Sequence, residues 1–200
     1  AHLASTLRRT ALAAGFATLL GVPVGFAMAA SERIRATLSP LIAALFALPV
    51  VAMFPLLVLV LGGTEAALVF TAALGSFVLL VWNARSGAEA IDPTFLEVAR
   101  NNGATSRRSL LREVWLPGSL PLVFVGLRLG LSMSLLIVTA VEFVAGNDGL
   151  GYVLFVSWQS AQLPRLYATL FIIGAVGVTL AEGVGRLRVH LIPWDPASDR

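Results

Sequence analysis

Few residues of this 200-residue chain carry groups that could do chemistry. There is no Cys, and the two His residues, His2 and His190, lie near opposite ends of the sequence. Disulfides, thiolate nucleophiles and Cys-based zinc sites are therefore excluded, and no His cluster is available for a haem or a metal. All fourteen basic residues are Arg, so the Lys of a phosphate-binding P-loop is also missing. We expect no metal, no cofactor and no catalytic residue in this chain.

The composition places the chain in a membrane. Hydrophobic residues make up 58% and charged residues 12%, whereas soluble domains are about half apolar and about a quarter charged. So few polar residues cannot cover a water-exposed globule, and a disordered chain would need low hydrophobicity with high charge. The net charge of +3 raises nucleic-acid binding as an alternative, which the positions of the Arg residues can test.

Five apolar stretches are long enough, or nearly so, to cross a bilayer. They cover residues 10–30, 41–63, 66–84, about 119–145 and about 166–181. We therefore predict an all-α, polytopic transmembrane helix bundle with five spans and a single domain over residues 1–200. The sequence begins at Ala1 rather than at Met, which leaves room for a further helix upstream.

The second stretch contains two prolines, Pro49 and Pro55, which should kink it and free backbone carbonyls. Such carbonyls are tolerated only beside protein or water, so we expect this span to border a cavity. Pro49, Met53 and Pro55, together with Ser132 on the fourth stretch, are therefore candidates for a pathway or gate.

The Arg residues are divided unequally between the two sets of connecting segments. One set carries ten Arg residues, including those of the long loop 85–118 and of the C-terminal segment, and the other set, with the loop 146–165, carries three. The positive-inside rule assigns the ten-Arg side to the cytoplasm. The basic charge then reflects topology, and no nucleic-acid partner is expected.

Three charged residues lie in or beside the apolar stretches, where a charge is costly and marks a functional candidate. For Arg128 we expect the side chain to reach the nearer membrane surface. Glu142 has two interpretations, a residue that lines the pathway or gate and a cap for the segment that follows it. Glu182 lies four residues before Arg186, a spacing that favours a local ion pair.

Small residues recur every four positions in two of the stretches, which lets helix backbones approach closely in lipid. The first stretch has Ala17, Gly21, Gly25 and Ala29, and the fourth has Gly126, Gly130 and Ser134. Generic helix packing explains both stripes. The alternative is that the fourth stretch faces a partner subunit across a pathway.

The loop 85–118 is longer than a turn requires and predicts two short helices. Asp92 can cap the first, with Pro93 at its first position, and Gly103 suits its left-handed end. Thr105 or Ser106 could cap a second helix, which would end at residues 116–118. Such a pair, exposing apolar and Arg side chains together, is suited to docking another protein.

The run Glu97-Val98-Ala99, then Gly103, then Leu116-Pro117 resembles the EAA loop of ABC importer permeases. Val98 replaces an Ala of that pattern, and the interval from Gly103 to Pro117 is one residue longer than the resemblance leads us to expect. Further matches point to the nitrate, sulfonate and taurine-type subgroup: Leu7-Arg8-Arg9, Gly149-Leu150-Gly151-Tyr152 and Pro193-Trp194.

The resemblance implies a type I ABC importer permease in a bacterial inner membrane, with the EAA loop and the C-terminus in the cytoplasm. Its partners would be a cytoplasmic ABC ATPase dimer, which binds ATP and Mg²⁺, a second permease subunit (a copy or a paralogue), a solute-binding protein and membrane lipid. The loop residues expected to couple to the ATPase are Asp92, Pro93, Phe95, Leu96, Glu97, Ala99, Arg100, Gly103, Leu116 and Pro117. Glu97 could pair with an Arg of the ATPase or with Arg100.

The resemblance also suggests a small anion, such as a sulfonate, taurine or nitrate, as the substrate. Residues 150–162 should form an external helix that contacts the solute-binding protein, or one whose Tyr152 and Trp158 anchor it at the membrane interface. Two alternatives to an importer subunit are a self-sufficient secondary transporter and the membrane anchor of an enzyme complex. The first would need paired repeats, and the second would need clustered His, Cys or carboxylates.

Overall fold

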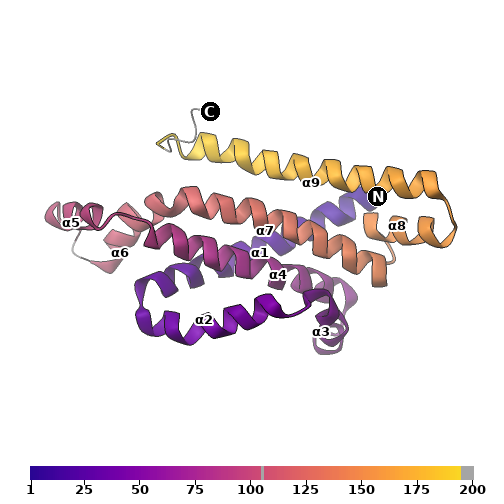
Figure 1. The fold of residues 1–200 in the computed structure, drawn as a ribbon, viewed down its shortest axis with the longest axis horizontal. Helices are drawn as coiled ribbons and strands as arrows, with labels where there is room; N and C mark the ends of the chain where they lie inside the picture. The colour runs from indigo at the N-terminus through magenta and orange to yellow at the C-terminus, as the bar shows by residue number, and fades with distance from the viewer. Residues whose placement is uncertain (105, 195–200) are drawn as a thin grey trace.

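The computed structural model describes residues 1–104 and 106–194, and these residues form a bundle of helices (Figure 1). The elements are α1 (His2–Ala30), α2 (Glu32–Ala47), the 3-10 helix η1 (Val50–Met53), α3 (Phe54–Leu61), α4 (Thr64–Glu89), α5 (Pro93–Asn101), α6 (Arg107–Leu110), the π-helical segment η2 (Leu111–Trp115), α7 (Leu116–Ala145), α8 (Leu150–Gln159) and α9 (Leu163–Leu191).

Four of these helices, α1, α4, α7 and α9, are long and apolar enough to cross a membrane. A fifth candidate span is the pair formed by α2 and the η1–α3 segment, which meet at an angle of 91°. The prediction of an all-α transmembrane bundle is confirmed, with four straight candidate spans and one broken one.

The break in the second span has a local cause at Pro49. A residue that precedes proline is disfavoured in the α conformation, and Leu48 is accordingly extended, with φ −72° and ψ 138°. Pro55 has a different effect from the predicted kink. It lies in the first turn of α3, where the missing N–H would have had no partner in any case.

Helix α4 is the centre of the bundle and packs on α1 and on α7, which also contact each other (Figure 1). Close approach on the α1 side depends on Gly25, because a Cβ there would lie 2.6 Å from the carbonyl oxygen of Val81. On the α7 side, a Cβ at Gly126 would lie 2.7 Å from the Cβ of Asn83. Real Cβ atoms do not approach other atoms so closely, so both contacts need glycine.

The stripe of small residues on α7 therefore belongs to a contact inside the chain. Ser134 and Ser76 of α4 share a hydrogen bond of 2.6 Å, and Ser76 also donates to the carbonyl of Gly130 at 2.9 Å. Gly126, Gly130 and Ser134 are all buried. This favours helix packing within the chain over the alternative that the stripe faces a partner subunit, since the stripe is filled by α4.

Two helices extend beyond the apolar runs from which they were predicted. Helix α1 begins at His2 rather than at residue 10, and α9 covers Leu163–Leu191 rather than 166–181. The apolar-run criterion stops at charged residues, whereas a helix continues through them.

Helix α9 packs on α7 and α8, and Thr169 is its one buried residue among those described. An ion pair of 3.0 Å joins Arg128 on α7 to Glu182 on α9. This pair corrects the expectation for Glu182, which bonds Arg128 of α7, whereas a local pair with Arg186 was expected. The expectation that Arg128 reaches the nearer membrane surface stays a prediction.

Candidate functional site

The connecting segments separate to opposite ends of the long axis of the bundle (Figure 1). At one end, here called the loop end, lie α5, α6 and the turn between α1 and α2, and Arg35 after that turn bonds Glu89 of α4. At the other end, here called the α8 end, lie the start of α1, the turn before α4 and α8. The segments richer in Arg are thus gathered at the loop end.

Helix α5 begins and ends where the sequence predicts. The carboxylate of Asp92 accepts a hydrogen bond of 2.8 Å from the amide of Thr94, and Pro93 occupies the first turn. That backbone bond holds the pKa of Asp92 below its ordinary value of 3.8, because it stabilises the ionised form. Gly103 follows the helix with φ +97°, a conformation that glycine adopts without strain.

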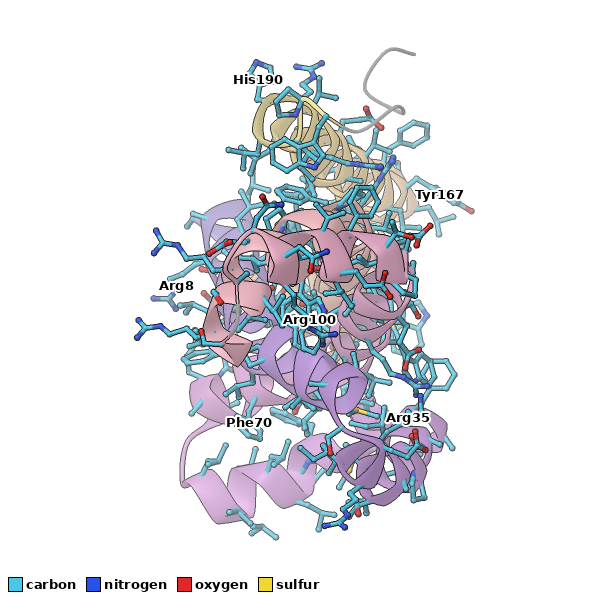
Figure 2. The ribbon with its side chains drawn as sticks, turned by 90° about the vertical axis from the view of Figure 1, so that its left-hand side faces the viewer. Arg8, Arg35, Phe70, Arg100, Tyr167 and His190 are labelled. Atoms are coloured by element: carbon cyan, nitrogen blue, oxygen red, sulfur yellow. The ribbon has the colours of Figure 1, made fainter. Side chains whose placement is uncertain are left out.

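Helix α5 turns apolar side chains outward at the loop end. Phe95 is 65% exposed and Val98 is 52% exposed, and Glu97 and Arg100 beside them are also exposed. Leu96 and Ala99 are half-buried. Figure 2 views the bundle from this end, with Arg100 near the middle of the face. Exposed apolar side chains flanked by charges are typical of a surface that binds a partner.

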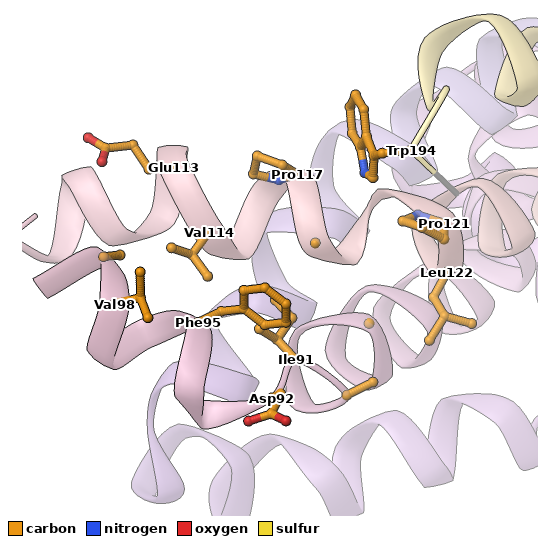
Figure 3. A pocket seen from close by; sticks show the side chains of 14 residues that line it. Ile91, Asp92, Phe95, Val98, Glu113, Val114, Pro117, Pro121, Leu122 and Trp194 are labelled. Atoms are coloured by element: carbon orange, nitrogen blue, oxygen red, sulfur yellow. The ribbon is translucent and has the colours of Figure 1, made fainter. Parts of the chain in front are cut away.

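A groove of about 770 Å³ lies between α5, the start of α7 and Trp194 (Figure 3). Phe95, Val98, Val114 and Pro117 contribute apolar side chains to it. Asp92 and Glu113 are its charged lining residues. The structure therefore brings members of both halves of the predicted EAA-like pattern, Val98 and Ala99 from the first and Pro117 from the second, to one groove.

The second half of the loop differs from its prediction. Ser106 accepts a bond of 3.0 Å from the amide of Ser109, as a cap would, while Thr105 lies outside the described residues. The helix does not stop at residues 116–118, because the π-helical segment η2 carries it directly into α7. Leu116 and Pro117 are thus the first turn of a span.

The pathway candidates lie in two places. Pro49, Met53 and Pro55 lie in or beside the break between α2 and α3, and Ser132 is an exposed residue of α7. Beside the break, a small cavity of about 160 Å³ is lined by apolar residues that include Leu48, Val50, Gly75, Met133 and Leu136.

Glu142 lies apart from them, at the α8 end, and none of its surface is exposed. Its carboxylate accepts hydrogen bonds from Arg9 at 2.8 Å, from Thr6 at 2.8 Å and from the amide of Gly151 at 3.1 Å. Of the two interpretations of Glu142, the structure shows the cap, since its carboxylate meets the start of α8.

The environment of Arg9 is the part of the molecule that the sequence did not predict. Arg9 is 6% exposed and bonds Glu65 of α4, Glu142 of α7 and Asp148 of the following loop, at 2.7, 2.8 and 2.6 Å. Bonds from Ser5 and then from Arg9 lower the pKa of Asp148 below its ordinary value. The acidic groups around Arg9 are arranged as its partners, and no group of three potential metal ligands occurs in the part of the chain that the structure describes.

Comparison with known proteins gives one family and several relatives. Residues 19–190 match the family of the binding-protein-dependent transport system inner membrane component. The taurine transport system permease protein TauC of Escherichia coli K12 is 32% identical over 193 residues, which are 96% of this chain and 70% of that protein. The putative aliphatic sulfonates transport permease protein SsuC of Bacillus subtilis 168 is 28% identical over 96% of this chain and 70% of its own length.

Solved structures show a similar fold. A chain of the methionine ABC transporter MetNI in an inward-facing conformation superposes with a TM-score of 0.81 at 18% identity, over 94% of this chain and 93% of that one. A chain of an amino acid ABC transporter gives a TM-score of 0.72 at 22% identity, over 97% and 92%. At such identities the likeness concerns the fold.

Proposed function

Because the chain belongs to the family of binding-protein-dependent transport system inner membrane components, and is thus an ABC transporter permease with an importer-type fold, we propose that it forms the translocation pathway of an ATP-driven importer. The family is one of transport subunits rather than of enzymes. ATP and Mg²⁺ would bind a separate ATPase dimer, and two permease subunits, copies or paralogues, would enclose the pathway.

The observation that carries the proposal is the surface of α5 at the loop end. Asp92 caps the start of this short helix, and Gly103 follows its end with a positive φ. The helix exposes Phe95 and Val98, with Glu97 and Arg100 beside them. Residues 90–92 link α5 to α4 along the chain, and α5 contacts η2, which runs into α7. A force applied to α5 would therefore reach both spans. A docked ATPase could therefore move the bundle through this one helix.

The proposed orientation places the loop end in the cytoplasm of a bacterial cell and the α8 end on the outer face of the inner membrane. The excess of Arg residues in the segments gathered at the loop end supports this orientation. A solute-binding protein would then deliver substrate at the α8 end, where Trp158 is 60% exposed.

The proposed substrate is a small organic or inorganic anion such as taurine, another sulfonate or nitrate. Its support is the similarity to a taurine permease and to a permease for aliphatic sulfonates. Taurine is therefore the first compound to test.

The test compares Gly103→Asp with Gly62→Asp. Both glycines have positive φ, +97° and +67°, and neither would bring a new Cβ within 4 Å of another atom, so the backbone strain is matched. Gly62 lies at the α8 end, between α3 and α4. In proteoliposomes that contain the transporter with its ATPase, Gly103→Asp should lower ATP-dependent uptake of radiolabelled taurine about tenfold or more while ATP hydrolysis persists. Gly62→Asp should keep the two coupled.

Normal coupled uptake by Gly103→Asp would overturn the assignment of α5 as the docking element. Uptake by the chain alone, driven by a proton or sodium gradient without ATP, would instead identify a secondary transporter.

A further inference from the structure

We propose that Arg9 is a positioning residue that makes the ends of α1, α4, α7 and α8 move as one body while the transporter changes state. That these helix ends move during transport rests on the proposed function, whereas the contacts that join them do not. The residues involved, His2, Thr6, Arg9, Glu65, Glu142 and Asp148, are here called the Arg9 network.

The guanidinium of Arg9 uses every N–H that it has. Nε donates to the carboxylate of Glu65 at 3.0 Å, and Nη2 donates to Glu65 at 2.7 Å and to Asp148 at 2.6 Å. Nη1 donates to Glu142 at 2.8 Å and to the backbone carbonyl of Asp148 at 3.2 Å. One planar group thereby fixes α4, α7 and the loop after α7 relative to α1. A Lys has three donors on one nitrogen and could not reproduce this fork.

The same residues cap the start of α8 from other helices. Three successive amides, those of Gly149, Leu150 and Gly151, donate to His2 Nδ1 at 3.1 Å, to Thr6 Oγ1 at 2.8 Å and to Glu142 Oε2 at 3.1 Å. The first amides of a helix have no partner within it. Since these three partners belong to α1 and α7, the start of α8 cannot leave those helices without exposing unpaired groups.

The atoms around this cap are packed so closely that two of its glycines could not carry a side chain. A Cβ at Gly149 would overlap the carboxylate of Glu142, and one at Gly151 would overlap the carbonyl oxygen of Thr139. The backbone of α8 therefore touches the end of α7 directly.

The burial of the network makes it hard to open. Glu142 has no exposed surface, and the side chain of Arg9 is 7% exposed, so separating them would leave the fully buried carboxylate of Glu142 without its charged partner. In the described part of the chain, α2, α3 and α9 contribute no side chain to the Arg9 network. Relative movement at the α8 end is thus assigned to those helices.

The experiment measures distances between pairs of spin labels in the reconstituted transporter complex. The chain has no native Cys, so two exposed positions can be labelled cleanly. The pair Ala66→Cys on α4 and Ser160→Cys after α8 measures a distance between two parts of the proposed body. The pair Leu59→Cys on α3 and Ser160→Cys measures the distance between that body and a helix outside it. Each pair is measured without nucleotide and after trapping with ATP and vanadate. We expect the first distance to stay constant and the second to change.

The role of Arg9 is tested on the first pair with a neighbouring control. Arg9→Lys should broaden the distance distribution about twofold, because the fork of bonds is lost. Arg8→Lys should not, since Arg8 binds the same Glu65 from a side chain that is 62% exposed. Thr6→Val removes a cap of α8 but no charge, and it should also broaden the distance distribution. This variant keeps the test decisive if Arg9→Lys does not fold.

A change of the Ala66–Ser160 distance with nucleotide would overturn the proposal, as would equal distributions for the Arg9 and Arg8 variants. If nucleotide alters neither pair, the transport assignment fails, and the comparison of the Arg9 and Arg8 variants still decides the role of Arg9.

Discussion

The guanidinium of Arg9 and the carboxylate of Glu142 lie 2.8 Å apart, although 133 positions separate the two residues in the sequence. Both side chains are shielded from solvent, at 7% and 0% exposure. Each residue alone would be an expensive charge in the bundle, and together they join the first span to the fourth.

Removal of Glu142 should therefore be costly. Glu142→Ala removes one of the acceptors of Arg9. It also leaves two other donors, the Thr6 hydroxyl and the Gly151 amide, without their acceptor at Glu142. We expect a loss of about 3–5 kcal/mol in the free energy of unfolding, measured by denaturant titration in detergent. The matched control is Glu182→Ala, whose partner Arg128 is half exposed, and which should cost about 0–1 kcal/mol. Equal losses in the two variants would contradict the burial argument.

Close packing on α4 makes a second prediction. Gly25→Ala places a Cβ 2.6 Å from a carbonyl oxygen of α4 and should destabilise the bundle by about 1–3 kcal/mol, because backbone must shift. Gly174→Ala on α9 meets no atom within 4 Å and should be neutral or stabilise by up to about 1 kcal/mol. Thermal unfolding of the two purified variants separates these outcomes, and a tolerated Gly25→Ala would show that α1 and α4 are less closely packed.

The cap of α5 predicts a dependence on pH. The pKa of Asp92 is lowered by the Thr94 amide, so its ionised form stabilises α5 above the ordinary pKa of about 3.8, and this contribution is lost as the pH falls through the lower pKa of the folded state. Asp92→Asn keeps a capping side chain that does not titrate. Asp92→Ala should speed hydrogen exchange of the α5 amides at neutral pH, and Asp92→Asn should not. Identical exchange in all three proteins would exclude the cap.

Orientation can be read with single thiols. Asn102→Cys at the loop end should be unreactive toward a membrane-impermeant maleimide in intact cells and reactive in inverted vesicles. Ser160→Cys at the α8 end should behave in the opposite way. Since the chain has no other thiol, the background is clean. Labelling of the Asn102→Cys variant from outside would place α5 on the wrong side for an ATPase.

The sequence was most informative where the determining signal is local. Asp92 and Pro93 begin α5, and Gly103 ends it, because capping and positive φ depend on residues within one turn. The broken second span was also predictable from Pro49, since a proline acts on the residue before it. Apolar runs located all five stretches, but they misplaced the start of α1 because they treat Arg9 as outside the helix.

The Arg9 network could not be predicted because its members are far apart in the sequence. Glu65 and Glu142 come from different spans, and no spacing rule relates them to Arg9. Their meeting follows from the packing of α1 and α7 against α4 and against each other. The small-residue stripes suggested close packing without specifying the neighbour. Pro117 was assigned to the end of the second loop helix for another reason. A proline can stop a helix, but here η2 runs directly into α7, and Pro117 lies in the first turn of α7 without ending the helix.

The cap on α8 also has a consequence for synthesis of the protein. Thr6 and Arg9 leave the ribosome long before Glu142 and Asp148, so during translation the guanidinium has Glu65 alone. Nη1 then lacks both of its partners, and Nη2 keeps Glu65 but lacks Asp148. A nascent chain that stops before the end of α7 keeps these donors unpaired at the α8 end.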